Sequence, residues 1–140
     1  MREIDLQQQV ADYIRLQYPN VIFHSDFGSG IKLTMGQAIK QKRLNGGRRS
    51  WPDMFLAEPD IGKTGGFKKI WFGLFIELKR EGTRIYKKDG KLVADEHIRE
   101  QFDMLEQLRR RGYAAEFACG FEAAVDLIDS YMKGNYAHID

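Results

Sequence analysis

A short apolar segment that ends in charged residues is the part of the sequence with the clearest chemical potential. Residues 74–79 read LFIELK, and because strand side chains alternate between two faces, Glu77 and Lys79 point to the same side. A carboxylate and an ammonium group at the end of so apolar a strand lose hydration unless they are paired or bind a ligand. The two residues therefore form either a simple ion pair or part of a binding site.

A second acid is predicted to join them. Asp53 immediately precedes another apolar segment, residues 54–56, and the glycine-rich stretch 62–66 predicts a turn between the two segments. Pairing across that turn would bring Asp53 beside Glu77. Carboxylate oxygens without thiolates or histidines are the ligands that a hard cation such as Mg²⁺ prefers, and such a cation polarises a phosphoryl oxygen and generates hydroxide from bound water. Lys79 would then stabilise charge that develops on the same phosphate.

The elements that must position these residues alternate between helix and strand. Helical periodicity, caps and turn residues predict helices over residues 4–18, between a Thr34 cap and Gly46, over 98–111 and over 121–132. Apolar runs predict strands at 21–23, 54–56, 70–79 and 114–118. A turn signal at Asp89-Gly90 predicts a small hairpin appended to the sheet. The resulting order, α-β-α-β-β-α-β-α, predicts an α/β sandwich.

Length and composition exclude several classes of protein. With 140 residues, 43% of them hydrophobic, the chain is expected to form one domain, residues 1–140, around an apolar core. A single cysteine, Cys119, forms no internal disulfide, and three scattered histidines lack the clustering of a zinc site. The longest apolar run, residues 70–76, is too short to span a membrane, and no signal-type apolar stretch follows Met1. We expect a soluble, cytoplasmic protein.

Positive charge in this chain is concentrated rather than abundant. The formal net charge is only +2. The segment 40–49 nevertheless carries cations and no acid, its basic residues being Lys40, Lys42, Arg43, Arg48 and Arg49. A second basic cluster occupies residues 109–111. Such clusters occur as solvated faces, or they bind the backbone phosphates of nucleic acid with strong salt dependence and little base readout.

Two short motifs, Pro52-Asp53 and Glu77-Leu78-Lys79, resemble the signature of the PD-(D/E)XK nuclease superfamily. A wider pattern resembles the VRR-NUC branch of that superfamily, in the short stand-alone form found in phages and prophages. It extends over almost the whole chain and comprises Glu3, Tyr18-Pro19, Trp51-Pro52-Asp53, residues 73–79, Gln101, Gly112-Tyr113 and Tyr131. The sequence departs from the family at Trp51, where a glycine is frequent, and in the hairpin around Asp89-Gly90. Neither departure touches the expected metal ligands.

The resemblance implies a restriction-endonuclease-like α-β-α sandwich with a central mixed sheet flanked by helices. It also implies that Asp53 and Glu77 bind the metal ion, with the Leu78 carbonyl as a third ligand, and that Lys79 stabilises charge or orients water. The expected cofactor is Mg²⁺, for which Mn²⁺ substitutes. The roles of Asp53, Glu77 and Lys79 agree with those reached from residue types alone.

Two further polar residues are expected to contribute. Glu3 continues the helical face of positions 6, 7, 10 and 14 toward the sheet, where it would act through a metal-bound water; alternatively it is an acid favoured at a helix N-terminus. Gln101 lies on an apolar helix face, where an amide without partners costs about 1–3 kcal/mol. We expect Gln101 to orient Lys79, a water or a phosphate, although it also fits a satisfied core glutamine. His24 and Asp26 fit either substrate contact or an ordinary loop role.

The expected function is that of a Mg²⁺-dependent endonuclease that hydrolyses the phosphodiester bonds of DNA. The resemblance implies 5′-phosphate and 3′-hydroxyl products, branched or flap-like DNA substrates, a homodimer, and a place in the cytoplasm of a bacterial host if the gene belongs to a phage or prophage. The competing hypothesis is a non-catalytic nucleic-acid-binding or assembly module, which the joint presence of Asp53, Glu77 and Lys79 disfavours. Cleavage of RNA is a third hypothesis that the sequence leaves open.

Overall fold

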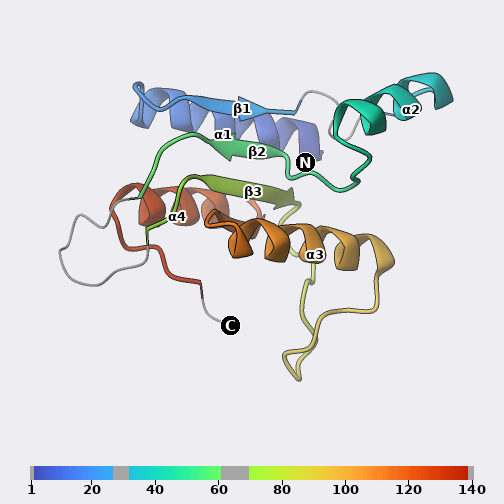
Figure 1. Cartoon of the computed structure of the whole chain (residues 1–140). Coiled ribbons are helices and arrows are strands. Elements are labelled where there is room, and N and C mark those ends of the chain that lie inside the picture. The colour runs from blue at the N-terminus through green and yellow to red at the C-terminus, as the bar shows by residue number, and fades with distance from the viewer. Residues whose placement is uncertain (1, 27–31, 61–69, 139–140) are drawn as a thin grey trace.

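The computed structural model describes residues 2–26, 32–60 and 70–138 (Figure 1). Its elements in chain order are α1 (Glu3–Gln17), β1 (Phe23–Ser25), α2 (Met35–Leu44), β2 (Met54–Leu56), β3 (Leu74–Lys79), α3 (Glu96–Arg110), β4 (Ala114–Cys119) and α4 (Phe121–Met132). This is the predicted order of helices and strands. The predicted turn at 62–66 lies outside the described residues. No helix within the described ranges is long and apolar enough to cross a membrane.

The four strands form one mixed sheet in the order β1-β2-β3-β4. β1 and β2 are antiparallel, as are β2 and β3, whereas β3 and β4 run parallel. The predicted pairing of the two acidic segments is confirmed, because Met54 lies opposite Ile76 and Leu56 lies opposite Leu74. β3 is therefore a central strand with a neighbour on each side.

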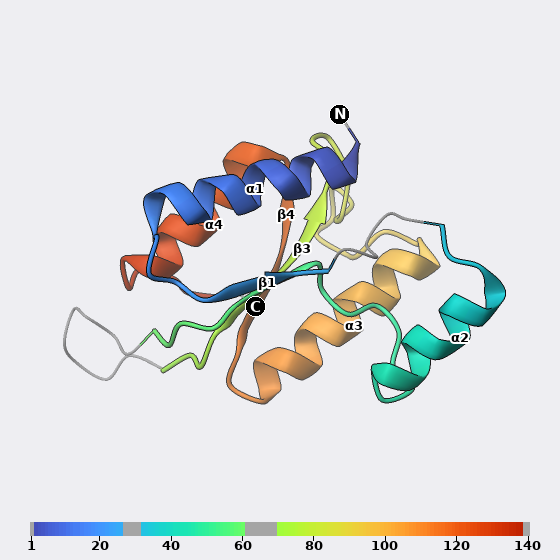
Figure 2. The ribbon, with the colours of Figure 1, turned by 90° about the horizontal axis from the view of Figure 1, so that it is seen from above.

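Helices cover both faces of this sheet (Figures 1 and 2). On one face, Leu74, Ile76 and Leu78 pack with buried residues of α1 and α4, among them Val10 and Ile128. On the other face, buried residues of α3 pack against β3 and β4 in a smaller cluster that includes Met104, Leu105, Ala115 and Phe75. Alternate residues of β3 thus point to different helices, as strand geometry requires. The predicted sandwich with a mixed central sheet is confirmed.

A carboxylate with two tyrosine partners joins α1 to α4. Asp129 on α4 accepts hydrogen bonds from the hydroxyl groups of Tyr13 at 2.6 Å and Tyr18 at 2.7 Å. Partial burial alone raises the pKa of Asp129, but the two hydrogen bonds outweigh that effect and hold the pKa below its ordinary value. Burial and then the bond to Asp129 raise the pKa of Tyr13 to about 12.

The predicted positions of two strands differ from the structure by two residues or more, and one predicted attachment also differs. The first strand begins at Phe23 rather than at residue 21, and the central strand begins at Leu74 rather than at residue 70. Before Leu74, Trp71 forms a single bridge with Asp60. The hairpin around Asp89-Gly90 has one bridge, between Tyr86 and Leu92, and adds no strand to the sheet. It cannot attach to β3, because β2 and β4 already occupy both edges of that strand.

Candidate active site

The carboxylates of Asp53 and Glu77 lie side by side at one end of the sheet. Met54 faces Ile76 in the ladder between β2 and β3, so the preceding residue, Asp53, lies next to Glu77. Both side chains are buried, with relative exposures of 8% and 4%. The Leu78 amide donates a hydrogen bond to Oδ2 of Asp53 at 2.7 Å. The backbone of β3 therefore fixes the orientation of the acid that comes from the neighbouring strand.

The negative charge of the Glu77 and Asp53 carboxylates is only partly balanced by Lys79. Burial raises the pKa of the Glu77 carboxyl well above its ordinary value, and the charge of Asp53 raises it further, while the charge of Lys79 opposes both effects. Oε2 of Glu77 is buried and accepts no hydrogen bond from the described residues. An adjacent cation favours the ionised form of such a carboxyl group. The pair of acids is therefore arranged to receive positive charge.

Lys79 lies at the end of β3, on the same face as Glu77. Its side chain is buried, with a relative exposure of 7%, and its backbone carbonyl accepts a hydrogen bond from Gly120 at 2.8 Å. The structure thus holds an ammonium group and two carboxylates at one strand end, as the alternation of residues 74–79 predicts.

Gln101 reaches the site from α3. Its Nε2 donates a hydrogen bond to Oε1 of Glu77 at 2.8 Å. Its Oε1 is buried and has no hydrogen-bond partner among the described residues. The Gln101 side chain therefore has a hydrogen-bond partner, as its apolar surroundings predict. That partner is Glu77, which the sequence did not identify. The other half of the amide remains an acceptor facing the same buried region.

A cavity of about 710 Å³ lies over these residues. It is lined by Asp53, Glu77, Lys79 and Gln101, together with Glu3 of α1, and its remaining wall comes from α2, the loop that follows α2, Asp26 and His97. All five predicted catalytic residues therefore line one cavity. The structure brings together what the sequence had placed on four separate elements.

The predicted basic residues divide into two groups. Lys42, Arg48 and Arg49 line the cavity. Lys40 and Arg43 are exposed on α2 but do not line it. The second cluster lies at the C-terminal end of α3, whereas Gln101 and the cavity lie toward its N-terminal half. There Arg109 donates to the Ala115 carbonyl and Arg111 to that of Gln107, so this cluster stabilises the fold away from the site.

The sequence did not identify two residues in or near the cavity, His97 and Gln7, and it left the role of Asp26 undecided. His97 lines the cavity one helical turn before Gln101, and that spacing was the available signal. Gln7 is buried on α1, and its Nε2 donates to the Asp26 carbonyl at 3.0 Å. Asp26 also lines the cavity, and its amide donates to the Asp53 carbonyl at 2.8 Å. His24 is exposed on β1 and does not line the cavity.

The donor set at this site suits a hard divalent cation. Among the residues that the structure describes, no group of three or more His, Cys, Asp and Glu side chains is close enough to hold a metal ion. The protein ligands would accordingly be the two carboxylates of Asp53 and Glu77, with water and substrate oxygens completing the shell, which is how Mg²⁺ is commonly held. The acceptor of Glu77 that lacks a partner fits such an ion. The Leu78 carbonyl as a third ligand stays a prediction.

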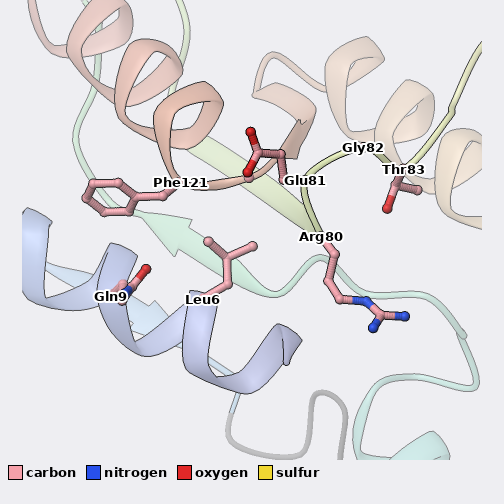
Figure 3. A pocket seen from close by; sticks show the side chains of 8 residues that line it. Leu6, Gln9, Arg80, Glu81, Gly82, Thr83 and Phe121 are labelled. Atoms are coloured by element: carbon pink, nitrogen blue, oxygen red, sulfur yellow. The ribbon is translucent and has the colours of Figure 1, made fainter. Parts of the chain in front are cut away.

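A second cavity, of about 570 Å³, lies beyond the end of β3. Figure 3 shows its walls, which come from α1, from the turn after β3 and from the start of α4. Arg80 and Glu81 contribute opposite charges to it, and Leu6 and Phe121 contribute apolar surface. None of the predicted site residues lines this second cavity.

Comparisons with known proteins support the fold. No family model matches the chain, and a search of curated proteins finds no match. Among solved structures, the chain is similar to a VRR_NUC domain protein, with 22% sequence identity, a TM-score of 0.64, and coverage of 99% of this chain and 98% of that chain. The chain therefore shares the α/β fold of that protein along nearly its whole length, and the predicted resemblance is confirmed at the level of the fold.

Proposed function

We propose that the protein, as one domain over residues 1–140, is a divalent-metal-dependent endonuclease that hydrolyses phosphodiester bonds in DNA. The observation that carries the proposal is that two buried carboxylates, those of Asp53 and Glu77, lie next to each other. Lys79 and Gln101 line the same cavity. A nuclease-type fold is compatible with this function but does not establish it.

Asp53 and Glu77 would hold Mg²⁺, or Mn²⁺ in its place, and the Leu78 carbonyl is the proposed third protein ligand. When bound, such a cation polarises a phosphoryl oxygen and lowers the pKa of a coordinated water. The raised pKa of Glu77 supports this assignment, because burial and the neighbouring Asp53 charge both disfavour its ionised form without a cation. Leu78 holds Asp53 in place through its amide.

The remaining residues have distinct roles in the proposal. Lys79 stabilises negative charge that develops on the phosphate during cleavage. Gln101 positions the Glu77 carboxylate through the hydrogen bond at 2.8 Å. Glu3 acts from the first turn of α1 at the rim of the cavity, through a water molecule. Catalysis thus depends on groups supplied by two strands and two helices.

DNA would enter along the basic side of the cavity. Lys42, Arg48 and Arg49 line it, and cations at such positions bind phosphates without reading base sequence. Hydrogen bonds hold this segment against α3, from Arg48 to Gln107 and from Ser50 to Glu100, both at 3.3 Å. Selectivity for branched or flap DNA, homodimer formation and action in a bacterial cytoplasm rest on the family resemblance.

A non-catalytic DNA-binding or assembly module is the second candidate. Such a module needs the basic residues but has no use for two buried carboxylates next to each other. Burial of like charges lowers stability unless a counter-charge is present, and this favours the catalytic proposal.

The test uses the purified protein with supercoiled, linear and branched DNA, in the presence of Mg²⁺ or of a chelator. We expect cleavage with Mg²⁺ only, and we expect Asp53→Asn to lose cleavage while retaining metal-free DNA affinity. The matched control is Asp103→Asn, because Asp103 is an exposed carboxylate on α3. A parallel assay with RNA of the same shape separates the two nucleic acids. Binding without cleavage of any DNA or RNA would establish the module instead.

A further inference from the structure

Helix α2 presents apolar side chains to the catalytic cavity rather than to the core. None of its residues is buried, and Figures 1 and 2 show it beside the sheet rather than against either face. Met35 and Ile39 are 81% and 64% exposed, yet both line the cavity together with Ala38. A helix this short gains little stability from its own hydrogen bonds. Its apolar side is a surface that a ligand in the cavity would cover.

Trp51 extends this apolar surface toward the carboxylates. It lines the same cavity two residues before Asp53, and its side chain is 39% exposed. Two contacts fix the orientation of the indole. Its ring centroid lies 6.3 Å from that of Phe75, and its Nε1 donates a hydrogen bond to the Asn45 carbonyl at 3.4 Å. A large aromatic side chain fixed in this way presents a ready stacking surface.

The charge around this surface indicates the chemistry of its occupant. From residue 32 to residue 52 the described chain contains no acid, and Lys42, Arg48 and Arg49 line the cavity beside the apolar residues. The acids of the cavity, Glu3, Asp26, Asp53 and Glu77, come from other elements. An apolar surface on a segment that carries cations and no acid complements a polyanion that also carries flat, weakly polar groups. Single-stranded DNA has both features, since cations bind its backbone and aromatic side chains stack on its bases. A second copy of this chain would bring the same cations against these cations.

We propose that Met35, Ile39 and Trp51 form a nucleobase-binding wall that receives an unstacked base of the DNA strand being cut, while Lys42, Arg48 and Arg49 hold the adjoining phosphates. This inference rests on the proposed function, because Asp53 and Glu77 mark where the scissile phosphate lies. It adds a determinant of substrate choice. The bases of a fully paired duplex stay stacked on one another and cannot bind to the nucleobase-binding wall. An unpaired nucleotide next to the cleaved bond can place its base against this wall.

The test compares two labelled single-stranded oligodeoxynucleotides of equal length in the presence of a chelator. One carries bases, and the other has abasic residues throughout, so that both have the same phosphates. We expect the wild-type protein to bind the base-containing strand about 5- to 150-fold more tightly, as measured by fluorescence anisotropy. Trp51→Ala should lose most of this ratio, and Trp51→Phe should keep most of it. Replacing exposed Met35 and Ile39 together by Ser should also reduce the ratio without disturbing the core.

A second readout follows Trp51 directly. The chain has two tryptophans, and Trp71 is buried in the core, so Trp71→Phe leaves Trp51 as the only tryptophan emitter. The base-containing strand should quench its emission, and the abasic strand should not. Equal binding of both strands by the wild type, or an unchanged ratio in Trp51→Ala, would overturn the wall. A concentration-dependent change in emission without DNA would overturn it in favour of a second copy.

The same preparation separates failure of the wall from failure of the proposed function. Cleavage of DNA with Mg²⁺ alongside equal binding of the two strands contradicts only the nucleobase-binding wall. Absence of both DNA binding and cleavage contradicts the proposed function and, with it, the wall.

Discussion

Gln101 on α3 donates a hydrogen bond to Glu77 on β3 at 2.8 Å. The contact crosses from the helix layer to the central strand and fixes one oxygen of the carboxylate. It leaves Oε2 of Glu77 and Oε1 of Gln101 buried without a partner among the described residues. The amide therefore orients a carboxylate whose second oxygen is available to a cation.

The first prediction concerns this positioning role. Gln101→Ala should weaken Mg²⁺ binding or reduce cleavage about 10- to 100-fold, which is the usual loss when a group that orients a metal ligand is removed. The measurement is the Mg²⁺ dependence of cleavage together with calorimetric titration of Mg²⁺. Gln8→Ala, at an exposed position of α1, is the control. A Gln101→Ala protein with wild-type metal affinity and cleavage rate would show that this hydrogen bond has no positioning role.

Most of the scaffold around these residues could be predicted because it follows from short-range pattern. Alternation identified the faces of residues 74–79, and helical spacing identified the buried side of α1, including Leu6, Val10 and Ile14. The pairing of Asp53 with Glu77 followed from two apolar segments separated by a glycine-rich stretch. These features depend on residues that are close in sequence or on segments that follow one another along the chain.

The parts that could not be predicted depend on how distant elements pack. Met35, Ala38 and Ile39 have the spacing of a buried helix face, yet the fold leaves α2 beside the cavity with this face exposed. The partner of Gln101 depends on where α3 crosses the sheet. The hairpin near Gly90 carries a clear turn signal, but its place depends on β3 having no free edge.

The second prediction concerns the pH dependence of stability at the junction of α1 and α4. The folded pKa of Asp129 is lowered, so its stabilisation is present above its unfolded value, about 3.9, and is lost as the pH falls through the folded pKa. The pKa of Tyr13 is raised to about 12. Its stabilisation is therefore present below its unfolded value, about 10, and is lost as the pH rises toward 12.

Asp129→Asn should reduce the free energy of unfolding at neutral pH by about 1–2 kcal/mol, because two hydrogen bonds lose their charged acceptor. It should also flatten the acid side of the stability profile in urea denaturation. In Tyr13→Phe, the free energy of unfolding should fall less steeply as the pH rises above about 10. Its decrease at acid pH should stay steeper than in Asp129→Asn. Parallel acid profiles for wild type and Asp129→Asn would contradict this account.

The third prediction concerns the close approach of Phe55 to Gly73 at the start of β3. A Cβ atom at residue 73 would lie 2.7 Å from the Phe55 ring, so Gly73→Ala should lower the free energy of unfolding by about 1–3 kcal/mol. Chemical denaturation measures this change. The control is Gly36→Ala on α2, where a Cβ meets open space and where alanine should stabilise the helix by about 0.5–1 kcal/mol. Equal stabilities of the two variants would contradict the packing at Phe55.

The fourth prediction concerns the division of the basic residues. Lys42→Ala should weaken metal-free DNA binding and lower the slope of log affinity against log salt by about 1, as expected when one phosphate contact is lost. Arg110→Ala should leave that slope unchanged, because Arg110 lies at the C-terminal end of α3, away from the cavity, and forms an ion pair with Glu106 at 3.7 Å. The measurement is fluorescence anisotropy of labelled DNA over a range of salt concentrations. If the Arg110 variant lowers the slope and the Lys42 variant does not, DNA follows a path along α3 rather than the cavity that contains Asp53 and Glu77.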